Sequence, residues 1–247
     1  MSIAYDHVAG TLRGDARAIE DLRSRLQGLR DPSQLAAAME EVGVTPPVTE
    51  DDQFLDAVRV ALGTPIFTVE LTVSGPGGEQ RHVIDAGINA AAVRWSIARP
   101  DLAELSASPF PLLPGGMARL VRFRPGDFPL HPDASVAVPR DAVLALAAKT
   151  KKERITAWET VRDLLDGHID VEQADASWQL VRSHCRWVAV DGEETEDMSV
   201  HLRAGDHYFV LVEAEGSLSL IPVPSVTAFE TMVRVLPGSD EVRDPRS

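Results

Sequence analysis

The sequence predicts an α+β fold, in which a central antiparallel β-sheet is flanked by helical regions and two halves are related by a pseudo-twofold axis. Apolar residues recur at helical spacing in the first part of the chain, and from about residue 66 apolar and polar residues alternate strictly instead. The same change from helices to strands recurs after about residue 141. Two similar stretches close these passages, "MARLVRFRPG" (117–126) and "FETMVRVLPG" (229–238), which share Val-Arg and Pro-Gly at matching positions. We therefore expect an internal duplication.

A single domain is expected to span residues 1–247. Its first half covers about 15–130 and its second half about 131–240, and residues 239–247 are expected to form a flexible tail. The period of about 115 residues is too long for a solenoid repeat. Pairing the sheets of the two halves would hide edge strands that otherwise invite aggregation.

The first half is predicted to begin with three helices. Residues 1–14 carry no clear pattern, but residues 16–43 hold two runs of apolar residues at helical spacing. The break between them is "DPS" (31–33), where Pro32 favours the start of a new helix. "DDQFLDAVRVALG" (51–63) predicts the third helix, because acidic residues fill its first turn and a glycine ends it.

Strands follow in the first half. "IFTVELTVS" (66–74) alternates strictly and predicts a half-buried antiparallel strand, and "GPGG" (75–78) predicts a turn. Two more strands are expected in "EQRHVID" (79–85) and "AAAVRWSIA" (90–98). "PFPLLP" (109–114) is interpreted as a short strand or extended piece, and 115–126 as a closing helix that ends at Pro-Gly.

The second half repeats this order. "SVAV" (135–138) predicts a short strand, and Asp141 is the expected N-cap of residues 142–165, which form one long helix or two helices with a break near Thr150. A further helix is expected over 171–184. Strands are then expected in "CRWVAVD", "MSVHLR", "HYFVLVEA" and "SLSLIPV", before a last helix with Ser225 as its N-cap.

Composition and charge exclude several classes of function and cellular location. The formal charge of −14 would repel phosphate backbones and anionic lipid, so no nucleic-acid partner is expected. The N-terminus lacks the apolar core of a signal peptide, and no apolar run is long enough to insert in a membrane. One cysteine cannot form an internal disulfide. These features predict a cytoplasmic protein.

Catalytic and metal-binding patterns are few. "SGPGGEQ" lacks the lysine of a phosphate loop and joins two strands, so it is interpreted as a hairpin turn. A hydrolase would use Cys185 as nucleophile with His184, His201 or His207 as base, but a lone cysteine at the start of an apolar strand is more often a small buried hydrophobe. We expect no catalytic residue, no metal, no cofactor and no enzymatic activity.

The chain resembles the EspG family of type VII secretion-associated chaperones of actinobacteria, over about residues 34–238. The resemblance rests on the residue pattern and on the order of predicted elements, rather than on signature residues. Three passages show it: "IFTVELTVSGPGGEQRHVIDAGINAAAVRWSI" with "LLPGGMARLVRFRPG", then "SVAVPRDAVLALA", then "MSVHLRAGDHYFVLVEAEGSLSLIPVPSVTAFETMVRVLP". It implies a non-enzymatic protein that binds the apolar tip of a helical secretion substrate, a PE–PPE pair or a WXG100-like protein, and keeps it soluble in the cytosol.

The resemblance also implies where a partner binds. In the family the sheet, the loop between early strands and a later helical region hold the substrate. Matched to this sequence, these are the turn after residue 74 and the helices between Asp141 and Trp178. The implied partner-binding residues are Gly75, Pro76, Gly77, Gly78, Glu79, Val143, Leu146 and Trp158. The alternatives are a homo-oligomeric adaptor without a client, such as a homodimer, and the Cys/His hydrolase.

Overall fold

The computed structural model describes residues 3–87, 89–95, 101–129, 135–169, 174–175, 177–214 and 217–243. Its helices are α1 (Ala16–Leu26), α2 (Pro32–Glu41), α3 (Gln53–Leu62), η1 (Phe110–Leu112), α4 (Leu113–Leu120), α5 (Arg140–Ala145), α6 (Lys151–Leu164) and α8 (Ser225–Arg234). Its strands are β1 (Ile3–Asp6), β2 (Thr11–Asp15), β3 (Val44–Thr45), β4 (Phe67–Gly75), β5 (Gly78–Ala86), β6 (Asn89–Trp95), β7 (Leu102–Pro109), β8 (Val136–Val138), β9 (Gln179–Val188), β10 (Glu194–Ala204), β11 (His207–Ala214) and β12 (Ser217–Val223).

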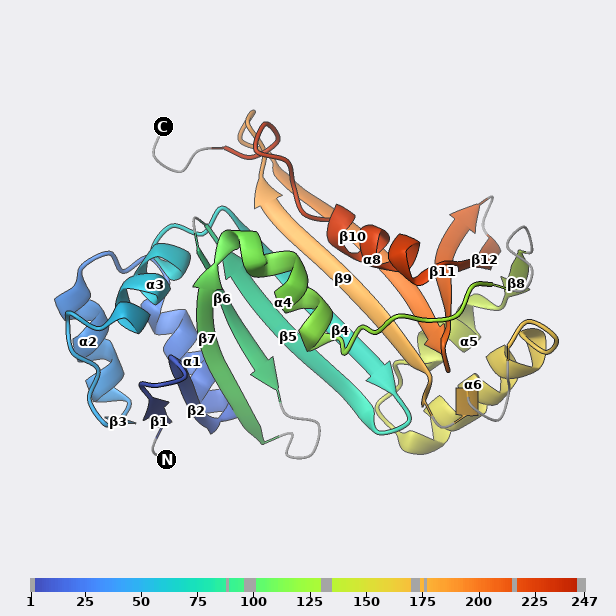
Figure 1. Ribbon diagram of the computed structural model, residues 1–247, viewed down its shortest axis with the longest axis horizontal. Helices are drawn as coiled ribbons and strands as arrows, with labels where there is room; N and C mark the ends of the chain where they lie inside the picture. The colour runs from blue at the N-terminus through green and yellow to red at the C-terminus, as the bar shows by residue number, and fades with distance from the viewer. Residues whose placement is uncertain are drawn as a thin grey trace.

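All twelve strands belong to one sheet, in the order β3-β1-β2-β7-β6-β5-β4-β9-β10-β11-β12-β8. Every neighbouring pair is antiparallel except β1 and β3. β4 and β9 meet in the middle, with Val69 opposite Cys185, and Figure 1 shows them running side by side across the centre of the molecule. The α+β class and the antiparallel core of the sheet are confirmed.

Helices cover the two faces of the sheet differently. Alternate side chains of β4, such as Val69 and Leu71, pack under α4 and α8 in one core cluster. Figure 1 shows these two helices in front of the middle of the sheet. The other face carries α1–α3 at one end and α5 and α6 at the other, as the contacts of Asp85 with α1 and of Leu180 with the α6 cluster indicate. Between these two helical groups no described helix covers the sheet, and side chains such as Arg81 and Arg182 are exposed there.

Each helical group closes its own hydrophobic core. The amphipathic faces of α1, α2 and α3 pack with β1, β2 and β7 around Leu22, Leu55 and Leu105. α5 and α6 pack on β8–β12 around Trp178 and Phe209. Side-chain caps start the helices, with Asp15, Asp31 and Asp52 accepting hydrogen bonds from backbone N–H groups of α1, α2 and α3.

Several sequence-based element predictions were wrong. β1 and most of β2 lie within residues 1–14, for which no element is predicted, and β7 forms where the sequence predicts no strand. "PFPLLP" forms the η1 turn and the start of α4 instead of a strand. Residues 179–184, predicted as helix, form the first part of β9, because pairing with both β4 and β10 overrides local helical preference.

The N-caps of two helices also differ from the predicted ones. Pro139 precedes α5, so Asp141 lies in the first turn, and Pro224 precedes α8, so Ser225 is its first residue. The region 142–165 is two helices, and Thr150 caps the second by accepting from the Glu153 N–H. Parts of four predictions lie outside the described residues: strand residues 96–98, helix residues 171–173 and 176, the turn at 215–216 and tail residues 244–247.

The two Pro-Gly pairs do not end the helices. α4 ends at Leu120 and α8 at Arg234, several residues before each pair. Gly126 instead packs against the β10–β11 turn, where a Cβ would lie 2.2 Å from the Asp206 carbonyl oxygen, so only glycine fits. Pro237 precedes a segment in which Val242 forms a β-bridge with Ala189, so residues of the predicted tail contact β9's end.

Candidate protein-binding surface

The predicted turn closes the β4–β5 hairpin. Gly75 and Gly78 pair across it, and Pro76 and Gly77 form its tip. Gly78 has φ of 132°, which glycine adopts without strain. Glu79 is exposed beside the turn, where it accepts hydrogen bonds from Ser74 Oγ at 3.1 Å and Arg182 Nη2 at 2.9 Å. The tip therefore offers a small, polar, solvent-facing surface.

Arg154 joins this turn to the helices α5 and α6. Its side chain is buried and donates from Nε to the Gly75 carbonyl oxygen at 3.2 Å. Its Nη1 donates to the carbonyl oxygens of Ala148 and Lys149, at 2.8 and 2.9 Å, in the link between the two helices. One guanidinium thus satisfies three carbonyls from two distant segments. The structure brings the two predicted parts of the surface together.

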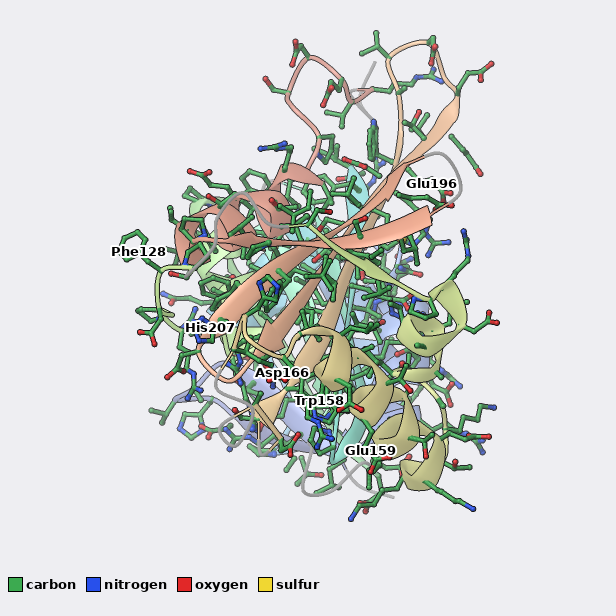
Figure 2. All side chains as sticks on the ribbon, turned by 90° about the vertical axis from the view of Figure 1, so that its right-hand side faces the viewer. Phe128, Trp158, Glu159, Asp166, Glu196 and His207 are labelled. Atoms are coloured by element: carbon green, nitrogen blue, oxygen red, sulfur yellow. The ribbon has the colours of Figure 1, made fainter. Side chains whose placement is uncertain are left out.

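Val143, Leu146 and Trp158 lie inside the α5–α6 core rather than on its surface. They are 4%, 1% and 4% exposed. The Trp158 ring stacks on Trp178 with centroids 5.4 Å apart, and its Nε1 donates to Asp175 at 2.8 Å. Figure 2 shows Trp158 toward the interior side of α6 and Glu159 toward its outer side. Their contact with a partner stays a prediction, and in this structure they hold α5 and α6 in place.

Sequence reasoning missed the groove between α5 and α6. We call it the α5–α6 groove, a hollow of about 550 Å³ lined by Ala142, Ala145, Thr150, Lys152, Glu153, Thr156, Ala157 and Thr160. Leu164 continues the Thr156–Thr160 stripe by one helical turn and is 40% exposed, and Leu144 on α5 is 60% exposed. The small residues at helical spacing in "TKKERITAWET" were the available signal.

The open sheet face between the helical groups is polar. Its exposed and half-buried side chains form ion pairs across strands, Arg81 with Glu70 at 2.7 Å and Arg182 with Glu79 at 2.9 Å, and His184 Nε2 is hydrogen-bonded to Glu196 Oε2 at 2.9 Å. Met198 on β10, at 63% exposure, adds an apolar patch to this face. Exposed pairs of this kind contribute little stability.

Cys185 and the histidines are not arranged for nucleophilic catalysis. Cys185 is fully buried, and burial, with a smaller effect from the Asp197 carboxylate, raises the pKa of its thiol to about 12. Its cross-strand neighbours are Val69 and Asp197. His184 lies on the opposite face, bonded to Glu196, because adjacent strand residues point apart. Burial lowers the pKa of His201 to about 4.

We therefore expect the native thiol to be inert. At pH 8 a thiol with a pKa of about 12 is almost wholly protonated, and the thiolate is the reactive form. A maleimide or disulfide reagent should label Cys185 slowly in the native protein and fully after unfolding in guanidinium chloride. Rapid stoichiometric labelling of the native protein would contradict the buried placement and reopen the hydrolase interpretation.

Within the described ranges, no three His, Cys, Asp or Glu side chains gather as they would around a metal ion. Among those same residues, no helix has the length and apolar character needed to span a bilayer.

Comparisons with protein-family models and with curated proteins find no match. Among solved structures, this chain is similar to the type VII secretion system chaperone EspG5 of Mycobacterium tuberculosis, determined in complex with a PE25–PPE41 dimer. The two chains are 14% identical, the likeness covers 94% of this chain and 99% of that chain, and the TM-score is 0.47. That structure is of a chaperone from the family that the sequence resembles.

Proposed function

We propose that this protein is a cytosolic chaperone for helical substrates of a type VII secretion system, PE–PPE pairs or WXG100-like proteins, and that it is not an enzyme. The α5–α6 groove carries the proposal, and Arg154 ties the helices that form it to the β4–β5 turn through its hydrogen bond to the Gly75 carbonyl oxygen. The sequence resemblance supplies the class of partner. The groove supplies a place where the apolar tip of a helical substrate can bind.

The groove has the chemistry that such a tip needs. Ala142, Ala145 and Ala157 present methyl groups and leave room for larger side chains of a partner. Leu164, which is exposed one helical turn beyond Thr160, extends the apolar area along α6. Removing such area from water contributes about 25 cal/mol per Å², from which the ordering costs of association are subtracted. Lys152 and Glu153 form a polar margin that favours one orientation of the partner.

We infer further that the two halves arose by duplication. Each half runs from a strand through helices to four antiparallel strands and a last helix: β2, α1–α3, β4–β7 and α4, then β8, α5–α6, β9–β12 and α8. The first strands of the two sets, β4 and β9, pair antiparallel in the middle of the sheet. A pseudo-twofold axis between them requires this pairing, and α4 and α8 then pack together over it.

A charge reversal at the turn tests its part in binding. Glu79→Lys places a cation beside Gly77 and Pro76, breaks the exposed ion pair with Arg182 and removes the acceptor of the Ser74 hydroxyl. The ion pair contributes little stability, so the fold should be retained, which circular dichroism of the purified variant checks. We expect the variant to recover much less of a co-expressed PE–PPE pair than the unchanged chain does, measured by co-purification on a tag carried by this protein.

Glu104→Lys is the matched control. Glu104 is a similarly exposed strand carboxylate paired with Arg13 at 2.8 Å, at the other end of the sheet. The Glu104→Lys variant should recover as much of the PE–PPE pair as the unchanged chain does. Equal recovery by the two variants would remove the turn from the binding surface.

A further inference from the structure

A second hollow lies at the opposite end of β4 from the turn. It has a volume of about 520 Å³ and lies between the end of α3, the start of β4, η1 and the C-terminal segment. Phe67, where β4 begins, and Gly75, where it ends, are separated by about 26 Å at the rise of an extended strand. The hollow is therefore separate from the α5–α6 groove. We call it the arginine pocket.

Its floor is hydrocarbon. Phe110 is 36% exposed and meets the buried ring of Phe67 edge to face, with centroids 6.0 Å apart. Further apolar walls come from Val60, Ile66, Pro237 and Val242. Ligand pockets for small molecules fall at about 300–1,000 Å³ and combine such walls with a few polar groups, so the size and lining fit that class.

Three arginines from separate segments line this hollow. Arg30 comes from the α1–α2 link, Arg59 from the last turn of α3 and Arg243 from the C-terminal segment. Arg59 pairs with Asp56 on its own helix at 2.5 Å. Among the residues that the structure describes, Arg30 and Arg243 have no ion-pair partner. In a chain with a formal charge of −14, this local concentration of cations is unusual.

The backbone fixes the walls of this pocket. Gly63 lets the end of α3 approach the α1–α2 link, where a Cβ would lie 2.8 Å from the Leu29 carbonyl oxygen. Gly87 lets the end of β5 approach the segment after α3, where a Cβ would lie 3.0 Å from the Thr64 carbonyl oxygen. The C-terminal segment is held by the hydrogen bond from the Arg243 N–H to the Val188 carbonyl oxygen, at 3.0 Å. The pocket therefore forms between anchored segments.

We propose that the arginine pocket binds a small apolar carboxylate of the medium-chain fatty acid type. Arginines are among its lining residues, and their guanidinium groups match a carboxylate, while the hydrocarbon floor matches an alkyl chain. A peptide is a poorer match, because its amides would face Val, Ile, Phe and Pro side chains and lose their hydrogen bonds to water without replacement. This site is independent of the proposed chaperone function.

Calorimetric titration of the full chain with decanoate tests the proposal, at low ionic strength and below the micelle concentration. We expect saturable binding of one decanoate per chain. Removing the charge should weaken binding, so 1-decanol should bind at least tenfold more weakly. Arg30→Glu with Arg243→Glu should lower the decanoate affinity at least tenfold. Ser239→Trp, at an exposed lining position, should fill the pocket and abolish binding.

A double variant elsewhere controls for net charge. Arg17→Glu with Arg119→Glu changes the charge by the same amount at exposed positions on α1 and α4, and should bind decanoate like the unchanged chain. Equal affinity for decanol, undiminished binding by the Arg30/Arg243 variant, or non-saturable uptake would overturn the proposal. The proposal would also be overturned if an apolar tetrapeptide with a free C-terminus bound to the chain and decanoate did not.

The decanoate-binding proposal and the chaperone proposal can be overturned independently of each other. The Arg30/Arg243 variant should still co-purify with a PE–PPE pair, since the pocket and the α5–α6 groove lie at opposite ends of β4. Loss of decanoate binding with normal recovery of the pair is the expected pattern.

Discussion

Replacing Asp85 by Asn is expected to lower the free energy of unfolding by about 3–5 kcal/mol, because it removes the buried counter-charge of the Arg23 guanidinium. The remaining carboxylate near Arg23, that of Glu20, is partly exposed and 3.4 Å away. Asp85 is fully buried on β5, and Arg23 of α1 reaches it with two hydrogen bonds, Nε to Oδ2 at 2.5 Å and Nη2 to Oδ1 at 2.8 Å. Thr68 Oγ1 also donates to Oδ1 at 2.9 Å. This network attaches the first helical group to the sheet beside its open face.

Urea denaturation followed by circular dichroism measures the effect, with Glu104→Gln as control. Glu104 makes an exposed ion pair with Arg13, so its loss should cost less than about 1 kcal/mol. Adding Arg23→Met to Asp85→Asn should recover part of the lost stability, because the unpaired charge is then gone. A loss below about 1 kcal/mol for Asp85→Asn alone would contradict the assigned network.

Filling the α5–α6 groove is expected to weaken partner binding more than any other surface change. Thr156 is exposed and lines the groove from α6, so Thr156→Trp should occupy the space without disturbing the core. Excluding an anchoring side chain of the partner costs about 2 kcal/mol or more, which corresponds to a rise of roughly 30-fold or more in Kd. Titration of a purified PE–PPE pair by calorimetry or biolayer interferometry measures it.

Glu159→Trp provides the matched control for this experiment. Glu159 lies on the same helix, is exposed and is absent from the groove lining, so the variant adds the same aromatic area at a neighbouring position. Figure 2 shows Glu159 at the outer side of α6. We expect its Kd to stay within about threefold of the unchanged chain. A similar Kd for both tryptophan variants would place the partner elsewhere on the molecule.

The strands with strong patterns were predictable from the sequence. β4 alternates over its whole length with Val, Leu and Phe on one face, and β11 and β12 were located at their observed bounds. β7, "LAELSASP", escaped notice because Ala and Ser give its alternation little hydrophobic contrast, although Ala103 and Leu105 are buried. The N-terminal strands are short, and β2 gains its stability by pairing with β7. No local sequence pattern predicts that pairing.

The candidate surface was predictable in part. The Gly-Pro-Gly-Gly turn was evident from composition, because such residues favour tight turns. The apolar stripe of α5 and α6, chosen as a contact surface, is instead the side that the fold buries around Trp158. Arg154 could not be assigned, because its bond to Gly75 joins residues 79 positions apart. A periodic apolar stripe identifies a helix's core face, whereas a partner surface lies on what packing leaves exposed.

The mass of the purified assembly tests the central claim most directly. The claim is that this chain binds a helical secretion substrate rather than copies of itself. The chain should be co-expressed with a PE–PPE pair and examined by size-exclusion chromatography with light scattering. The account predicts one stable peak whose mass equals this chain plus the pair, and that peak should be lost with Thr156→Trp and retained with Glu159→Trp. Separate elution of the pair from a self-associated form of this chain would contradict it.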